Sequence, residues 1–107
     1  MIEVTPAISI SEDEITERFI RAAGPGGQNV NKVSTAVELR FDVRRSPSLP
    51  NDVAVRLMRL AGRKLTQDGV LVLTAMSFRT QERNRADALE RLLELIREAA
   101  KPPPPPR

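Results

Sequence analysis

An alternation of apolar and polar residues between positions 33 and 43 sets the strongest constraint on how this chain can fold. A period of two over this length is typical of a β-strand with one buried face and one face in water. The row expected to be buried consists of Val33, Thr35, Val37, Leu39, Phe41 and Val43. A sheet built on such a strand needs a cover on one side only, and helices are the usual cover.

Two helices are predicted to supply that cover. The first begins near Pro50, with Ser48 or Asn51 as its cap. Its apolar positions are Val53 or Ala54, Leu57, Leu60, Ala61 and Leu65, with Arg56, Arg59 and Arg63 on the opposite, solvated face. The second begins near Gln81, and its apolar stripe is Leu89, Leu92, Leu93, Ile96 and Ala100. Both patterns have the spacing of an amphipathic helix.

Two further strands complete the expected sheet. Residues 15–22 resemble a strand with imperfect alternation, and residues 70–73 form a β-branched apolar run after a turn at 67–69. Residues 1–14 are expected to be irregular, with a turn or a single helical turn at 11–14. The predicted fold class is therefore α+β: a small, mainly antiparallel β-sheet packed against two α-helices.

The length allows one domain. The chain has 107 residues, of which 40% are apolar, and single domains typically run to about 100–150 residues. We expect residues 1–100 to form this domain. Residues 101–107 contain five consecutive prolines and are expected to begin a stiff, proline-rich linker, beyond which we expect the natural chain to continue.

The composition excludes several kinds of chemistry. The sequence contains no cysteine and no histidine, so disulfides, thiolate nucleophiles, histidine-bound metals and His-dependent triads are ruled out. The three phenylalanines are the only aromatic residues, which argues against a base-stacking platform. No apolar run approaches the ~18 residues of a membrane span, and no secretory signal is visible. We expect a cytoplasmic protein.

The net charge of +3 hides an asymmetry along the chain. Residues 1–20 hold five acidic side chains and one arginine, whereas residues 21–107 hold sixteen basic and nine acidic side chains. Most of the basic residues are arginines, whose planar guanidinium suits phosphate. A solvated surface explains such a balance equally well, but the skew favours an anionic partner, and nucleic acid is the leading candidate.

The glycine-rich segment Gly24-Pro25-Gly26-Gly27-Gln28-Asn29-Val30-Asn31-Lys32 can be neither helix nor strand. Paired glycines permit unusual backbone conformations and let a ligand approach the main chain, whose N–H groups can bind an anion or a developing oxyanion. A plain hairpin turn is the alternative, although the segment is longer than a two-residue hairpin needs. The spacing fits neither a P-loop nor a dinucleotide-binding fingerprint.

These residues resemble the signature of class I peptide-chain release factors, in which Gly-Gly-Gln is the central motif. The flanks match as well, at Arg21-Ala22 before the motif and at residues 33–36 and 39–42 after it. A second segment, residues 79–89, is similar to the family's Arg-Ser/Thr-Gln-x-x-Asn-Arg stretch. The resemblance covers roughly residues 8–100. The length favours the stand-alone ribosome-rescue branch, in which a linker and a basic tail follow the catalytic domain.

The resemblance implies an exposed Gly-Gly-Gln loop and a ribosome-dependent enzyme that hydrolyses the ester bond of peptidyl-tRNA without reading a codon. The implied catalytic residues are Gly26, Gly27 and Gln28. RNA binding or bracing of the loop is expected from Asn29, Asn31, Lys32, Arg79, Gln81, Asn84 and Arg85. The implied partners are ribosomal RNA of the peptidyl transferase centre and P-site peptidyl-tRNA. We expect a monomer that needs no metal and no cofactor.

Two other functions remain open at this point. A non-catalytic RNA- or ribosome-binding module could reuse the fold, although the intact Gly26-Gly27-Gln28 motif argues against it. A hydrolase of free peptidyl-tRNA would need its own general base, and the neutral polar segment offers none.

Overall fold

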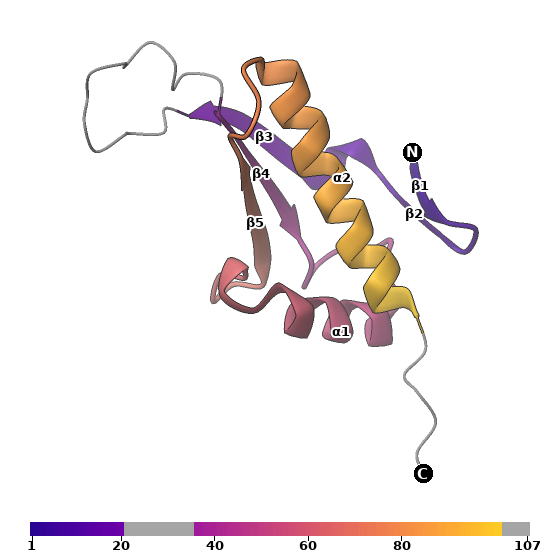
Figure 1. Ribbon diagram of the computed structural model, residues 1–107. Coiled ribbons are helices and arrows are strands. Elements are labelled where there is room, and N and C mark those ends of the chain that lie inside the picture. The colour runs from indigo at the N-terminus through magenta and orange to yellow at the C-terminus, as the bar shows by residue number, and fades with distance from the viewer. Residues whose placement is uncertain (21–35, 102–107) are drawn as a thin grey trace.

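The strand predicted from the alternation is β4 (Ala36–Asp42), the central strand of a three-stranded antiparallel sheet. Its neighbours are β3 (Ile15–Ile20) and β5 (Val70–Ala75). Val37, Leu39, Phe41 and Val43 are buried, as predicted. The computed structural model describes residues 1–20 and 36–101, so Val33 and Thr35 lie outside the described residues (Figure 1).

The structure combines this antiparallel sheet with two helices, which confirms the predicted α+β class. Helix α2 (Gln81–Ala100) runs across the inner face of the sheet, and α1 (Asn51–Ala61) packs against α2 (Figure 1). A single turn of 3₁₀ helix, η3 (Gly62–Lys64), follows α1. Within the described ranges, neither α1 nor α2 is long and apolar enough to cross a membrane.

The turn before β5 forms where it was predicted, and it requires a glycine. Gly69 has a φ of 86°, and a Cβ at this position would lie 2.6 Å from the Cβ of Arg44. The Gly69 carbonyl accepts hydrogen bonds from the main-chain N–H groups of Val43 and Arg44, at 3.1 and 3.2 Å. Gly69 therefore fixes the exit of β4 against the entry of β5.

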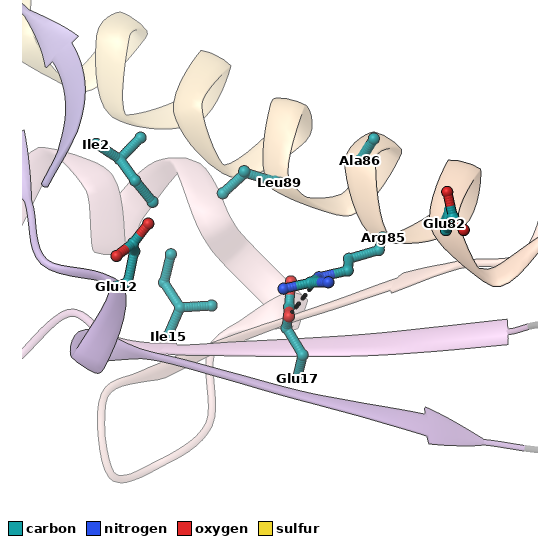
Figure 2. Close-up of a pocket in the computed structure, with 8 residues that line it drawn as sticks. All are labelled: Ile2, Glu12, Ile15, Glu17, Glu82, Arg85, Ala86 and Leu89. Atoms are coloured by element: carbon teal, nitrogen blue, oxygen red, sulfur yellow. Dashed lines mark hydrogen bonds and ion pairs between the residues drawn. The ribbon is translucent and has the colours of Figure 1, made fainter.

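The N-terminal residues are more regular than the sequence suggested. Strands β1 (Ile2–Thr5) and β2 (Ile8–Ile10) form a separate antiparallel hairpin. The Thr5 hydroxyl accepts hydrogen bonds from the N–H groups of Ala7 and Ile8 and so stabilises the turn. Ile2 lies near Ile15 of β3 and Leu89 of α2 (Figure 2). The prediction of an irregular start was wrong because strands of four and three residues are too short to show a clear period.

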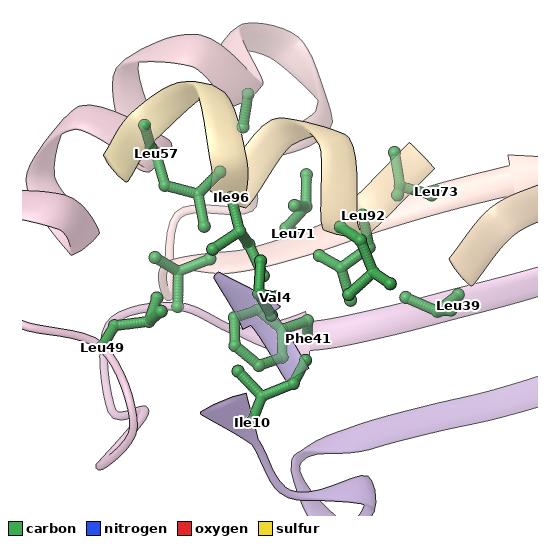
Figure 3. Packing of buried hydrophobic residues seen from close by; sticks show 14 of the residues in the cluster. Val4, Ile10, Leu39, Phe41, Leu49, Leu57, Leu71, Leu73, Leu92 and Ile96 are labelled. Atoms are coloured by element: carbon green, nitrogen blue, oxygen red, sulfur yellow. The ribbon is translucent and has the colours of Figure 1, made fainter. Parts of the chain in front are cut away.

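The core lies between the sheet, α1, α2 and the β1–β2 hairpin (Figure 3). Its largest fully buried apolar side chains come from all four of these parts: Ile10, Val37, Leu39, Phe41, Val43, Leu57, Leu71, Leu73, Leu92 and Ile96. Most of these side chains belong to one continuous cluster, to which the hairpin contributes Val4, Ile8 and Ile10.

Helix α1 differs from its prediction in three respects. Leu60 is 46% exposed, although the pattern placed it in the core. Leu65 lies beyond the end of the helix, because Gly62 adopts a positive φ of 56° and ends it. Arg56 is not on a solvated face: its Nε donates a hydrogen bond to the Ala99 carbonyl of α2 at 2.6 Å.

The predicted caps of α1 were also wrong. The N-cap residue is Pro50, which makes no side-chain capping hydrogen bond. Ser48 instead donates a hydrogen bond to the Glu14 carboxylate at 2.5 Å, and Ser46 donates to the other oxygen of the same group. Glu14 ends the short helix η1 (Glu12–Glu14) and accepts a further bond from the Ser11 N–H at 2.8 Å. One carboxylate thus joins η1 to the connection that precedes α1.

Leu57→Ala should lower the free energy of unfolding by about 2–5 kcal/mol, because Leu57 is fully buried and the truncation leaves a cavity. Leu60→Ala removes the same atoms from a half-exposed site and should cost less than about 1 kcal/mol. Urea unfolding of the two variants measures the difference. Equal losses would contradict the packing described for α1.

Glu14→Gln should make the free energy of unfolding less dependent on pH in the acidic range. Partial burial acts to raise the pKa of Glu14, but hydrogen bonds from Ser46, Ser48 and the Ser11 N–H outweigh it and hold the pKa below its ordinary value. A lowered folded-state pKa stabilises the protein at neutral pH, and this contribution is lost as the pH falls through the folded pKa. Unfolding free energies at about pH 7 and about pH 3 should therefore differ less in the variant than in the parent. An unchanged difference would contradict this role.

Candidate functional site

The central predicted site residues belong to the segment between β3 and β4. Gly26, Gly27, Gln28, Asn29, Asn31 and Lys32 lie outside the described residues. The ends of their segment are nevertheless fixed, because Ile20 of β3 pairs with Ala36 of β4. The chain therefore leaves the sheet and returns to it at one end, which we call the loop end of the sheet.

Helix α2 begins at this same end. Ala75, the last residue of β5, pairs with Val37, next to the point where β4 begins. Residues 76–80 then connect β5 to the first turn of α2, whose N-terminus lies at the loop end (Figure 1). The second predicted group of site residues, Arg79, Gln81, Asn84 and Arg85, is thereby placed beside the ends of segment 21–35.

Asn84 is the one buried polar side chain among the described residues. It is 0% exposed, and its carboxamide binds the main chain of Phe78 in the connection. The side-chain oxygen accepts from the Phe78 N–H at 2.9 Å, and the side-chain nitrogen donates to the Phe78 carbonyl at 3.0 Å. A buried amide satisfied in this way fixes the shape of the backbone around it.

Arg85 connects α2 to the edge of the sheet. Its Nε donates to a carboxylate oxygen of Glu17 in β3 at 2.7 Å (Figure 2). The Arg85 side chain is 61% exposed, so the pair adds little stability, but it links the first turns of α2 to β3. Below it lies a pocket of about 450 Å³, whose lining includes Glu12, Glu17 and Glu82.

The remaining two predicted residues differ in their surroundings. Gln81 is the first residue of α2 and is partly buried. Arg79 is exposed and makes no hydrogen bond or ion pair with any described residue. Of the four predicted residues in this group, Asn84 and Arg85 thus hold the loop end together, whereas Arg79 projects a charge from it.

Sequence reasoning missed three contributors to this end of the molecule. Thr80 caps α2, since its hydroxyl accepts from the Arg83 N–H at 3.2 Å, and a threonine directly before a helix is a signal that could have revealed it. The guanidinium carbon of Arg83 lies over the Phe78 ring, 4.6 Å from its centre. Glu17 pairs with Arg85 across 68 positions of sequence, which no local pattern indicates.

The opposite, outer face of the sheet carries a second charged cluster. Arg18 and Arg40 both donate to one oxygen of Glu38, at 2.9 and 3.1 Å. Partial burial acts to raise the pKa of Glu38, but the hydrogen bonds from Arg40 and Arg18 outweigh it and leave the pKa below its ordinary value. The carboxylate therefore stays ionised and holds β3 to β4 on the face turned away from α2.

The polar groups with described side-chain contacts at the loop end are the Asn84 amide, the Thr80 hydroxyl, the guanidiniums of Arg83 and Arg85, and the Glu17 carboxylate. Within residues 1–20 and 36–101, no group of three or more acidic, histidine or cysteine side chains is arranged to hold a metal ion. The polar side chains at the loop end are suited to positioning the main chain and to binding anionic groups.

Comparison with known proteins identifies the family. The RF-1 domain matches residues 2–104. Peptidyl-tRNA hydrolase ArfB of Pseudomonas putida is 50% identical over 101 residues, which are 94% of this chain and 73% of that protein. Large ribosomal subunit protein mL62 of Mus musculus is 36% identical over 94 residues, or 88% and 46% of the two chains. Peptide chain release factor 2 of Acidothermus cellulolyticus is 32% identical over 95 residues but aligns over only 23% of its own length. The chain belongs to the RF-1 domain family of peptide-chain release factors.

Proposed function

We propose that this protein is a ribosome-dependent peptidyl-tRNA hydrolase that releases the nascent chain from stalled ribosomes. The observation that carries the proposal is the 50% identity to a peptidyl-tRNA hydrolase over 94% of the chain. Independence from a codon is part of the proposal, because that alignment spans most of both proteins, whereas release factor 2 aligns over 23% of its length. The sequence Gly26-Gly27-Gln28 supplies the residues for the reaction.

The reaction needs a positioned water molecule and stabilisation of the charge that develops on the ester oxygens. With no histidine or cysteine in the chain, we assign positioning and electrostatics to the protein rather than proton abstraction. Gly26 and Gly27 would shape the backbone so that the Gln28 N–H can donate to the oxyanion or to the leaving 3′ oxygen. The Gln28 side chain would select water as the nucleophile, and ribosomal RNA and tRNA would complete the site.

The other residues of the segment are proposed to contact RNA or to shape the loop. Lys32 is assigned to a phosphate, since phosphate contacts position a protein without reading sequence. Asn29 and Asn31 suit either RNA contact or loop geometry, because asparagine tolerates left-handed backbone. The protein would act as a monomer in the cytoplasm, with P-site peptidyl-tRNA as substrate and no metal or cofactor.

The proposed catalytic domain comprises residues 1–100. Helix α2 ends at Ala100, which supports this boundary, and the proline-rich linker is proposed to begin at Lys101. Within the domain, Asn84 and Arg85 are assigned to bracing of the loop end. Their contacts to Phe78 and Glu17 support that assignment. Arg79, which no described carboxylate neutralises, is assigned to RNA, and Gln81 stays with the bracing or RNA-binding group.

Gly27→Ala should abolish peptide release, because a Cβ would restrict the backbone that presents the Gln28 N–H. Loss of one oxyanion donor costs about 10²–10³ in rate elsewhere, which sets the scale expected. Gln28→Ala keeps the main-chain N–H and should retain part of the activity. The measurement is release of labelled peptide from ribosomes whose mRNA ends at the P site. Equal losses in both variants would contradict this division, and a parent that binds ribosomes without releasing peptide would be a non-catalytic binding module.

Asn84→Ala should slow release about 10–100-fold, because the Phe78 N–H and carbonyl lose their partners and the loop end shifts. It should also lower the unfolding free energy by about 1–3 kcal/mol. Leu57→Ala is the matched control, since it destabilises the protein from a fully buried site in α1. Both variants are compared at a temperature where circular dichroism shows them folded. Release at the parent's rate by Asn84→Ala would exclude a positioning role.

A further inference from the structure

Phe78 and Arg83 form an exposed stack at the N-terminus of α2. The Arg83 guanidinium carbon lies 4.6 Å from the centre of the Phe78 ring. Phe78 is 36% exposed, and Arg83 is exposed as well. The guanidinium therefore lies over an aromatic ring, which attracts a cation through the negative potential of its π system.

The backbone beneath this stack is fixed on both sides. The buried Asn84 carboxamide binds the N–H and the carbonyl of Phe78, at 2.9 and 3.0 Å. The Thr80 hydroxyl accepts from the Arg83 N–H at 3.2 Å. Because these bonds order the main chain of both residues in the free protein, binding of a ligand costs less conformational entropy there.

The positive charge here is not neutralised by described carboxylates. Arg79 and Arg83 have no ion pair within the described part of the chain, whereas Arg85 pairs with Glu17 at 2.7 Å and Arg91 pairs with Asp87 at 3.0 Å. Glu82, which lies between Arg79 and Arg83 in the sequence, lines the pocket on the β3 side (Figure 2). The Arg83 guanidinium lies over the Phe78 ring, and Arg79, the next residue in the chain after Phe78, adds a second cation without a described ion pair.

We propose that Phe78, Arg79 and Arg83 form a binding site for an unpaired RNA nucleotide. The base stacks on the Arg83 guanidinium, and Arg79 donates to a phosphate oxygen. A stacked guanidinium favours a planar, anionic ligand of this kind over an acidic peptide, whose carboxylates have no ring to stack. The absence of tyrosine and tryptophan had argued against base stacking, but one arginine held by one phenylalanine provides a stacking surface of its own. The source of the RNA rests on the proposed function: ribosomal RNA or the single-stranded end of tRNA.

Binding of the full chain to large ribosomal subunits without tRNA, and to deacylated tRNA in solution, tests this site. Arg83→Ala and Phe78→Ala should each weaken binding about tenfold or more in the arm that contains the nucleotide. Arg83→Lys keeps the charge but loses the planar face, and it should bind nearly as weakly as Arg83→Ala. Arg79→Ala should reduce the dependence of log affinity on log salt by about one.

Arg63→Ala is the matched control, since Arg63 is an exposed arginine without a described ion pair in η3, far from the loop end. The site would be overturned if Arg83→Ala bound both RNAs as tightly as Arg63→Ala does. It would also be overturned if Arg83→Lys bound with the affinity of the parent. Failure of the parent to bind either RNA would overturn it too. Thermal melting confirms that each variant is folded. No step requires hydrolysis, so a parent that binds but does not release peptide would contradict the proposed function alone.

Discussion

One stripe of α2 determines both the stability of the fold and the form of its loop end. Ala88, Leu92 and Ile96 follow one another at four-residue intervals and are fully buried in the core. Asn84 occupies the preceding position of the same row and is equally buried, but its neighbour there is the main chain of Phe78. The row becomes polar where its neighbours change from apolar side chains to main-chain N–H and carbonyl groups that need hydrogen-bond partners, which Asn84 supplies. The helix that closes the core therefore also fixes the connection beside segment 21–35.

The elements that could be predicted from the sequence are those in which the apolar residues repeat regularly over many positions. The alternation up to Val43 predicted β4, and the helical spacing from Gln81 predicted α2 with its first residue correct. The same spacing could have placed Asn84 in the buried row, since it lies four residues before Ala88. Its burial was missed because an asparagine is not counted as apolar, although an amide with backbone partners is as compatible with burial as a methyl group.

The contacts that sequence reasoning missed join residues far apart in the chain. Ser48, which was predicted to cap α1, donates a hydrogen bond to the Glu14 carboxylate instead. Arg56, which was predicted to lie on a solvated face, donates a hydrogen bond to the Ala99 carbonyl. Propensity scales treat serine before a helix as a cap and arginine on a helix as solvated. Either residue adopts another role when a suitable partner from elsewhere lies within reach, and only the tertiary structure shows which partners those are.

The arrangement of charge gives the basic excess a meaning that net charge alone does not. Most arginines of the described chain are paired with carboxylates, including Arg18 and Arg40, which share Glu38. A one-to-one pair contributes little long-range potential, because the carboxylate cancels the cation, whereas the two arginines that share Glu38 keep one positive charge. The cations without described carboxylates gather at the two ends of the sheet, at Arg79 and Arg83 beside segment 21–35 and around η3 at the far end. An anionic partner would therefore be drawn toward these two ends of the sheet, and the Gly-Gly-Gln segment joins β3 to β4 at one of them.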